Sequence, residues 1–300
     1  MVQTRFTINR KLLVDEGSTN MPRSLTLLFV VCLLIVACPA TPFAQPPFDP
    51  HDFSGVWEQT GGARGINREK LTDVPEFTPE GKKMFDANLP SRGRLLGQPL
   101  NGDHPGLVRA RPPALSNDPI GTCTPQGPTR LMLDGEPMEF IHLNGRTLLF
   151  FQWGRVIREL WTDGRELPTG QNLSDIGPSW FGLSVGKWEG DTFVVNTIGL
   201  DDRSWLDIFG FPHSTEMRLE ERFKRVGPDK IELQMTVYDP KVYKAPFVSD
   251  TKTFARMPRE RLTYGGWYGF SGFLEGICAA VDELDFNKTI RDPAGLGRQQ

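Results

Sequence analysis

The residues best suited to chemistry lie close together in the chain, between positions 201 and 216. Asp201 and Asp207 occupy the first half of this stretch, and His213 and Glu216 occupy the second half. An imidazole can act as a general base or acid, and Asp201, Asp207 or Glu216 could orient or assist it. Alternatively, His213 is a turn residue that only hydrogen-bonds the backbone. The stretch therefore predicts either an acid–base site or a polar loop.

Aromatic and basic residues near these carboxylates suggest a binding site. Trp205 lies within the stretch, and Trp180 precedes the hairpin that leads into it. Aromatic faces beside carboxylates suit sugars or phenolic ligands, and paired carboxylates can cleave glycosidic bonds by acid–base catalysis. Arg130 and Arg165 are candidates for holding an anionic group of a substrate. The competing interpretation is that the Trp side chains belong to the hydrophobic core.

Glu221 is a further candidate because of its place in a predicted strand, 217–225. Alternation of side chains puts it on the apolar face of that strand, with Met217, Leu219 and Phe223. A buried carboxylate is costly unless it is paired or hydrogen-bonded. It therefore either forms a structural ion pair, with an arginine such as Arg130, Arg158 or Arg165, or it anchors a ligand or transfers a proton.

The histidine pattern gives little support for a metal site. Three histidines and a carboxylate could bind zinc, but the spacing of His51, His104 and His142 resembles no zinc motif. His142 lies in a predicted strand, where a hydrogen-bonded core histidine is the better interpretation. The sequence contains no CxxC, HExxH or P-loop motif. We therefore predict neither a metal nor a cofactor.

The elements that must position these residues are short strands joined by tight turns. Asn144-Gly145 lies between two apolar runs and is a strong hairpin signal. The predicted strands are 138–143, 146–152, 155–161, 183–188, 192–197, 217–225, 230–238 and 247–254, after an opening strand at Phe53–Trp57. Successive hairpins of this kind predict a mainly β fold, an antiparallel barrel or a strongly curved sheet with long loops and little helix.

The segments between the predicted strands contain few regular elements. Thr78-Pro79-Glu80 is typical of the start of a short helix, with Thr78 as its N-cap. Residues 92–119 form a long loop that either covers a barrel mouth or is merely solvated. A helix is expected at 275–284, and residues 289–300 are expected to be a disordered tail. We expect a single β-rich domain over residues 45–288.

The N-terminal segment resembles a secretory signal. Residues 25–37 form an apolar run that is short for a membrane span and typical of a cleavable signal. Cleavage after Ala44 would release the protein, so that residues 1–44 form the signal peptide. Alternatively, Ile35-Val36-Ala37-Cys38 resembles a lipobox, which would leave Cys38 lipidated and the protein tethered to a membrane. Both alternatives predict an extracytoplasmic protein.

Charge and cysteine content narrow the class of partner and the compartment. The chain has 34 Lys and Arg against 37 Asp and Glu, and 30 and 35 of these lie beyond residue 44. This acidic balance argues against a nucleic-acid partner, which would favour a basic patch. In an exported protein, Cys123 and Cys278 are expected to form a disulfide, with two buried thiols as the alternative.

Several motifs resemble a family of uncharacterised exported bacterial proteins that are numerous in soil bacteria. The matching positions are Ser54–Trp57, Cys123–Arg130, Gly186–Thr197, and Pro212–Ser214 with Glu221-Arg222-Phe223. The resemblance spans residues 53–278 and implies relatedness without implying an activity. Gly55-Val56-Trp57 and the order of the hairpins are also similar to lipocalin-like (calycin) barrels.

Two functional classes follow from these observations. The first is an exported barrel that binds a small apolar, aromatic or sugar-like ligand. The second is an acid–base enzyme, a lyase, isomerase or hydrolase that uses His213 and the nearby carboxylates. Both classes imply a small-molecule partner. A purely structural envelope protein fits less well, because so many polar groups are concentrated in one loop.

Overall fold

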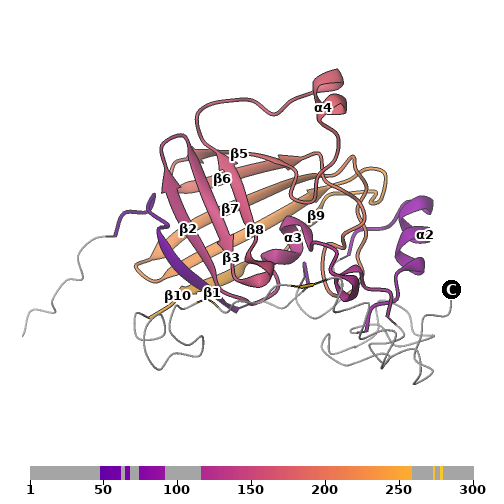
Figure 1. Ribbon diagram of the computed structural model, residues 1–300, viewed down its shortest axis with the longest axis horizontal. Coiled ribbons are helices and arrows are strands. Elements are labelled where there is room, and N and C mark those ends of the chain that lie inside the picture. The colour runs from indigo at the N-terminus through magenta and orange to yellow at the C-terminus, as the bar shows by residue number, and fades with distance from the viewer. Residues whose placement is uncertain are drawn as a thin grey trace, which may run out of the picture. The chain divides into compact units, whose positions relative to one another are not determined.

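A computed structural model describes residues 48–61, 65–67, 74–91, 116–258, 273 and 278–279 (Figure 1). The predicted signal peptide, which includes Cys38, lies outside the described residues. His104 and the predicted tail lie outside them as well. So do most of the loop expected at 92–119 and most of the helix expected at 275–284.

The fold is a β barrel, as the alternating sequence pattern predicts. The strands are β1 (Gly55–Gly61), β2 (Met138–Leu143), β3 (Arg146–Phe151), β4 (Ile157–Trp161), β5 (Leu183–Glu189), β6 (Thr192–Ile198), β7 (Arg218–Gly227), β8 (Lys230–Tyr238), β9 (Phe247–Val248) and β10 (Lys252–Arg256). Strands β1 to β8 pair in chain order. β10 pairs with both β1 and β8, which closes nine strands into a ring. The short β9 pairs with the other half of β8.

One strand pair departs from the expected antiparallel pattern. β4 and β5 are parallel, and their register covers only Leu160 with Ser184 and Trp161 with Val185. The long connection 162–182 carries the chain back to the end of the barrel from which β4 started, as a parallel pair requires. This connection contains α4 (Gly170–Ile176), which has no buried residue and stands clear of the sheet in Figure 1.

Few helices accompany the barrel. α2 (Pro79–Ala87) begins where the sequence predicts, and the Thr78 hydroxyl accepts a hydrogen bond from the Gly81 N–H. α3 (Gly127–Leu131) is short and completely buried. Two 3₁₀ turns, η2 (Pro119–Thr122) and η3 (Trp153–Arg155), complete the regular structure of the described residues. None of the helices described is long and apolar enough to cross a membrane.

Side chains fill the barrel interior. Phe53, Phe140, Phe193 and Phe223 are almost fully buried, with ring centroids 5.4 to 6.5 Å apart. Trp57 is also fully buried, and its indole N–H donates to the Phe53 carbonyl at 2.8 Å. The barrel is therefore built around an aromatic core.

The connection between β6 and β7 is part of this core. The loop places Leu206, Phe209 and Phe211 among the buried residues, and Phe211 packs against Phe85 of α2 and Phe247 of β9. The sequence predicts an acid–base site or a polar loop here, but the apolar residues at 205, 206, 208, 209 and 211 are buried and make the loop part of the core.

A disulfide joins Cys123 and Cys278, as the sequence predicts. The bridge spans a sequence separation of 155 residues. It holds the region of residue 278 against the turn that follows η2.

Candidate functional site

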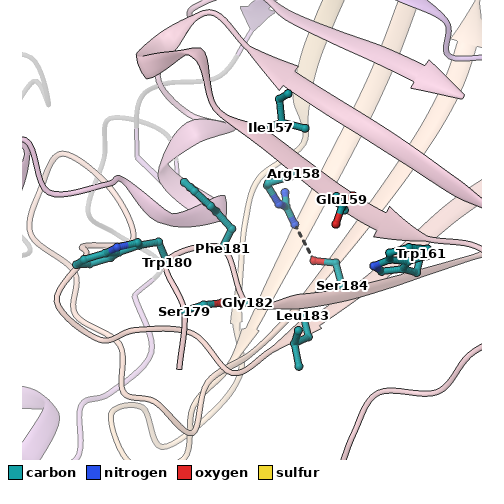
Figure 2. A pocket seen from close by; sticks show the side chains of 10 residues that line it. All are labelled: Ile157, Arg158, Glu159, Trp161, Ser179, Trp180, Phe181, Gly182, Leu183 and Ser184. Carbon is teal, nitrogen blue, oxygen red and sulfur yellow. Dashed lines mark hydrogen bonds between the residues drawn. The ribbon is translucent and has the colours of Figure 1, made fainter. Parts of the chain in front are cut away.

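The candidate site is a pocket of about 300 Å³ in the wall of the barrel, between β4 and the chain that enters β5 (Figure 2). It is lined by Ile157, Arg158, Glu159, Trp161, Ser179, Trp180, Phe181, Gly182, Leu183 and Ser184. Its volume is at the lower end of the range for small-molecule sites.

The pocket exists because β4 and β5 separate early. They share only two register pairs, so the first half of β4 has no strand partner on this side within the described chain. Gly182 lets the chain turn away, with φ of +63° and a position where a Cβ would lie 2.5 Å from the Ile198 carbonyl oxygen. Only glycine fits such a conformation and such a close approach.

Arg158 lies at the centre of the pocket wall and is 2% exposed. Its Nη1 and Nη2 donate to the two carboxylate oxygens of Glu221, at 3.0 and 2.7 Å. The Ser184 and Thr197 hydroxyls are 2.8 Å apart, and both lie within 3.5 Å of Nη2. The Nε of Arg158 has no hydrogen-bond partner among the described residues. A buried, unsatisfied N–H group costs stability.

Aromatic side chains lie on both sides of this polar centre. In Figure 2, Trp161 lies on one side of Arg158 and Ser184, and Phe181 and Trp180 lie on the other. A ligand with an apolar face and a hydrogen-bonding group matches this arrangement.

Two similar Asp–Arg turns hold the Trp rings. Asp163 accepts hydrogen bonds from the backbone N–H and the guanidinium of Arg165, and that guanidinium lies 3.6 Å from the ring centroid of Trp161. The hydrogen bonds from Arg165 hold the pKa of Asp163 below its usual value.

Asp201 makes the corresponding contacts with Arg203. It accepts from the backbone N–H at 3.0 Å and from Nε and Nη2 at 2.9 and 2.6 Å. The Arg203 guanidinium lies 4.2 Å from the ring centroid of Trp180. The hydrogen bonds from Arg203 lower the pKa of Asp201. Asp201, a candidate catalytic group in the sequence, therefore positions an arginine over a Trp of the pocket.

The predicted ligand-binding residues lie in different places. Trp180 lines the pocket. Glu221 lies behind Arg158 and forms an ion pair with it, one of the two roles that its strand position predicts. Arg165 contacts the pocket through Trp161.

Trp205 is buried outside the pocket lining. Arg130 is also outside it, and binds the Asp118 carboxylate through two bonds of 2.7 Å.

His213 is buried and hydrogen-bonded on both ring nitrogens. Its Nδ1 lies 3.2 Å from the Ser214 carbonyl oxygen, which can only accept, so Nδ1 carries the proton. Nε2 then accepts from the Ser204 hydroxyl, 3.0 Å away. Burial lowers the pKa of His213, which favours this neutral form.

The predicted carboxylate partners do not hydrogen-bond to His213 in the described structure. Asp207 is fully buried and accepts from the Ile66 and Phe209 N–H groups at 3.1 and 2.9 Å. Burial raises its pKa to about 6. Glu216 is exposed, and its backbone N–H donates to the Ser214 hydroxyl. The structure therefore does not assemble the four candidate catalytic residues into one hydrogen-bonded group.

Ser184 was not among the candidates from the sequence, although a local pattern marks it. Gly182-Leu183-Ser184-Val185-Gly186 matches the G-x-S-x-G pattern of serine hydrolases. In those enzymes the serine sits on a sharp turn between a strand and a helix. Ser184 instead lies within β5 and contacts Thr197 and Arg158, so the pattern marks a polar residue of the pocket rather than a nucleophile elbow.

The described histidines have structural partners. The Nε2 of His142 accepts a hydrogen bond from the Phe53 N–H, and its Nδ1 lies 2.9 Å from the Thr147 hydroxyl. His142 is therefore hydrogen-bonded, as the sequence predicts. The His51 ring lies 4.2 Å from that of Trp188, and its Nε2 lies 2.9 Å from the Gly190 carbonyl oxygen. Within the described residues, no three His, Cys, Asp or Glu side chains are grouped as a metal site would require.

In comparisons with known proteins, no family model matches this sequence, and no curated protein matches it significantly.

Proposed function

We propose that this protein is an exported barrel that binds a small, uncharged aromatic or sugar-like ligand in the pocket between β4 and β5. The observation that carries the proposal is Arg158, which lines a pocket with aromatic side chains on both sides and has a buried Nε without a partner among the described residues. A carbonyl, amide or hydroxyl oxygen of the ligand would accept from this group and from the Ser184 hydroxyl.

The charge around Arg158 supports an uncharged ligand. Glu221 already neutralises the guanidinium at 2.7 Å, and both side chains are buried. An additional buried anion would have no counter-charge of its own, which is costly. A neutral acceptor gains the hydrogen bond without this cost, so amides, esters, ketones and hydroxyl groups fit better than carboxylates.

The proposal places the protein outside the cytoplasm, either released or tethered through Cys38. The apolar segment at 25–37 and the resemblance to exported bacterial proteins support export, and so does the Cys123–Cys278 disulfide, because disulfides persist in oxidising compartments. Cell fractionation and N-terminal sequencing of the processed protein would distinguish cleavage after Ala44 from lipidation at Cys38.

Isothermal titration with benzamide and benzoate tests the binding function. Benzamide presents a neutral acceptor on an aromatic ring, whereas benzoate has the same shape with a charge. We expect benzamide to bind more tightly, and Ser184→Ala and Trp180→Ala to weaken that binding. The matched control is Lys187→Ala, on the exposed face of β5. Absence of benzamide binding, or equal binding by all the variants, would refute the proposal.

A second candidate, an acid–base hydrolase, rests on the pair of Ser204 and His213. The 3.0 Å contact between Oγ and Nε2 is the geometry in which an imidazole removes a proton from a nucleophilic hydroxyl. Here the Ser214 carbonyl oxygen orients the imidazole. If the pair is active, p-nitrophenyl acetate should acylate Ser204, and both Ser204→Ala and His213→Gln should abolish the release of p-nitrophenol.

A further inference from the structure

A second pocket lies next to the first and shares a wall with it. It has a volume of about 190 Å³ and is lined by Ile120, Cys123, Thr124, Pro125, Gln126, Trp153, Gly154, Val156, Phe181 and Cys278. Phe181 lines both pockets. Val156 of the second pocket directly precedes Ile157 of the first. The two pockets are therefore neighbouring compartments on either side of Phe181, near the start of β4.

One residue in the wall of the second pocket has a buried, unpartnered acceptor. Gln126 is 4% exposed, and its Nε2 donates to the Asp134 carboxylate at 3.0 Å. This bond fixes the orientation of the amide, since a carboxylate can only accept. The Oε1 of Gln126 has no hydrogen-bond partner in the described structure. A ligand hydroxyl or amine, or a water molecule, would satisfy it.

The remaining wall is apolar. Ile120, Trp153, Val156 and Phe181 contribute hydrocarbon or aromatic surface, and the disulfide adds two sulfur atoms. The disulfide also holds the two cysteines of this wall together. The second pocket is thus a small, mostly apolar compartment whose wall includes Gln126.

We infer that the two pockets form one binding site for an elongated, uncharged aryl compound with a different polar group at each end. An acceptor at one end binds Arg158, the aromatic body lies along Phe181, and a donor at the other end binds Gln126. This inference rests on the proposed function, which supplies the ligand for the first pocket. Beyond the proposed function, it specifies that the ligand is elongated and that it carries an acceptor at one end and a donor at the other.

The chemistry of the two buried groups fixes this polarity. Arg158 offers only N–H groups, whereas the free atom of Gln126 is a carbonyl oxygen. A ligand with acceptors at both ends would leave Gln126 unsatisfied, and one with donors at both ends would leave the Arg158 Nε unsatisfied. Unsatisfied buried groups reject such analogues strongly, so these two atoms are specificity-determining.

The experiment compares four probes by isothermal titration: benzamide, biphenyl-4-carboxamide, 4′-hydroxybiphenyl-4-carboxamide and the 4′-methoxy analogue of the last. Benzamide reaches only the first pocket. We expect the second ring to strengthen binding, and the hydroxyl to add a further gain of roughly fivefold to tenfold, as one net hydrogen bond would give. The methoxy analogue cannot donate and should lack the gain from the hydroxyl.

Gln126→Met links the gain to one residue, because it keeps the length of the side chain and removes the acceptor. In this variant, we expect benzamide to bind as it does to the unmodified protein, while the hydroxyl gain disappears. The methoxy comparison needs no variant, so it holds even if Gln126→Met does not fold.

The outcomes separate this inference from the proposed function. If benzamide does not bind, the proposed function and the inference both fail. If benzamide binds but the second ring adds nothing, or the hydroxyl gain persists in Gln126→Met, only the inference is overturned. A 4′-methoxy compound that binds as well as the hydroxyl compound would show that Gln126 bonds water alone, and it too would overturn the inference.

Discussion

Arg158 and Glu221 face each other across the barrel interior and are joined by two hydrogen bonds of 3.0 and 2.7 Å. They lie on β4 and β7, which are not neighbours in the sheet. The pair therefore connects strands that share no backbone hydrogen bonds, and it holds the guanidinium at the pocket wall.

Removal of one partner of this pair should destabilise the protein strongly. Arg158→Met or Glu221→Met leaves an unpaired buried charge, and each should lower the free energy of unfolding by about 3–5 kcal/mol. The double variant removes both charges and should recover much of this loss. Urea unfolding of all four proteins measures the coupling. If the losses simply add, the two side chains do not stabilise each other.

The two Asp–Arg turns should affect ligand binding more than stability. Asp201→Asn keeps an acceptor for the backbone but removes the ion pair with Arg203, so the guanidinium is held less firmly over Trp180. We expect a loss of benzamide affinity of roughly twofold to fivefold, with little change in Tm, because the Arg203 side chain is largely exposed and ion pairs at the surface contribute little. Asp202→Asn, one residue away and exposed, is the matched control. Equal affinities for the two variants would contradict a positioning role.

Asp207 should give the stability an unusual dependence on pH. Burial raises its pKa from 3.8 to about 6, so between these values the folded protein binds more protons than the unfolded chain. This contribution is fully present below pH 3.8 and is lost as the pH rises through 6, a change of roughly 3 kcal/mol. Asp207→Asn should remove this component.

The measurement is urea unfolding at several pH values between 4 and 7, for the unmodified protein and for Asp207→Asn. His213 contributes with the opposite sign, because burial lowers its pKa and its stabilisation is lost as the pH falls below 6.5. His213 is present in both proteins, so the difference between their curves isolates Asp207. A difference that does not change with pH would show that Asp207 titrates normally.

The disulfide should contribute substantially to stability. It closes a loop of 155 residues, for which the loss of chain entropy in the unfolded state predicts up to about 5 kcal/mol. Cys123→Ser with Cys278→Ser should therefore lower the Tm markedly, and reduction of the unmodified protein should have the same effect. Peptide mass spectrometry without reduction should find the Cys123 and Cys278 peptides linked. Finding them separate would contradict the bridge.

The barrel could be predicted from the sequence because its signals are local. The hairpin 138–151 follows from Asn144-Gly145 between apolar runs, and the inward position of Glu221 follows from strand alternation. The parallel pairing of β4 and β5 could not be predicted in this way. It depends on where a long connection returns to the sheet, and no short motif encodes this.

The position of the candidate site was less predictable, for a physical reason. The loop at 201–216 has the highest density of catalytic residue types, but many of these groups satisfy buried or neighbouring backbone atoms. The pocket instead depends on Arg158, Ser184 and Phe181, which meet only when β5 pairs with β4. Ser184 does have a sequence signal, its G-x-S-x-G pattern, but that pattern suggests a different kind of site.

The closure of the barrel has a consequence for how the protein is made. β1 is the first strand of the described residues, and one of its two neighbours is β10, which ends at Arg256. A growing chain that has not yet produced β10 has two open sheet edges, on β1 and β8, which can pair with other chains. The ring can close only after β10 has been synthesised, so the nascent chain must be kept from association until then.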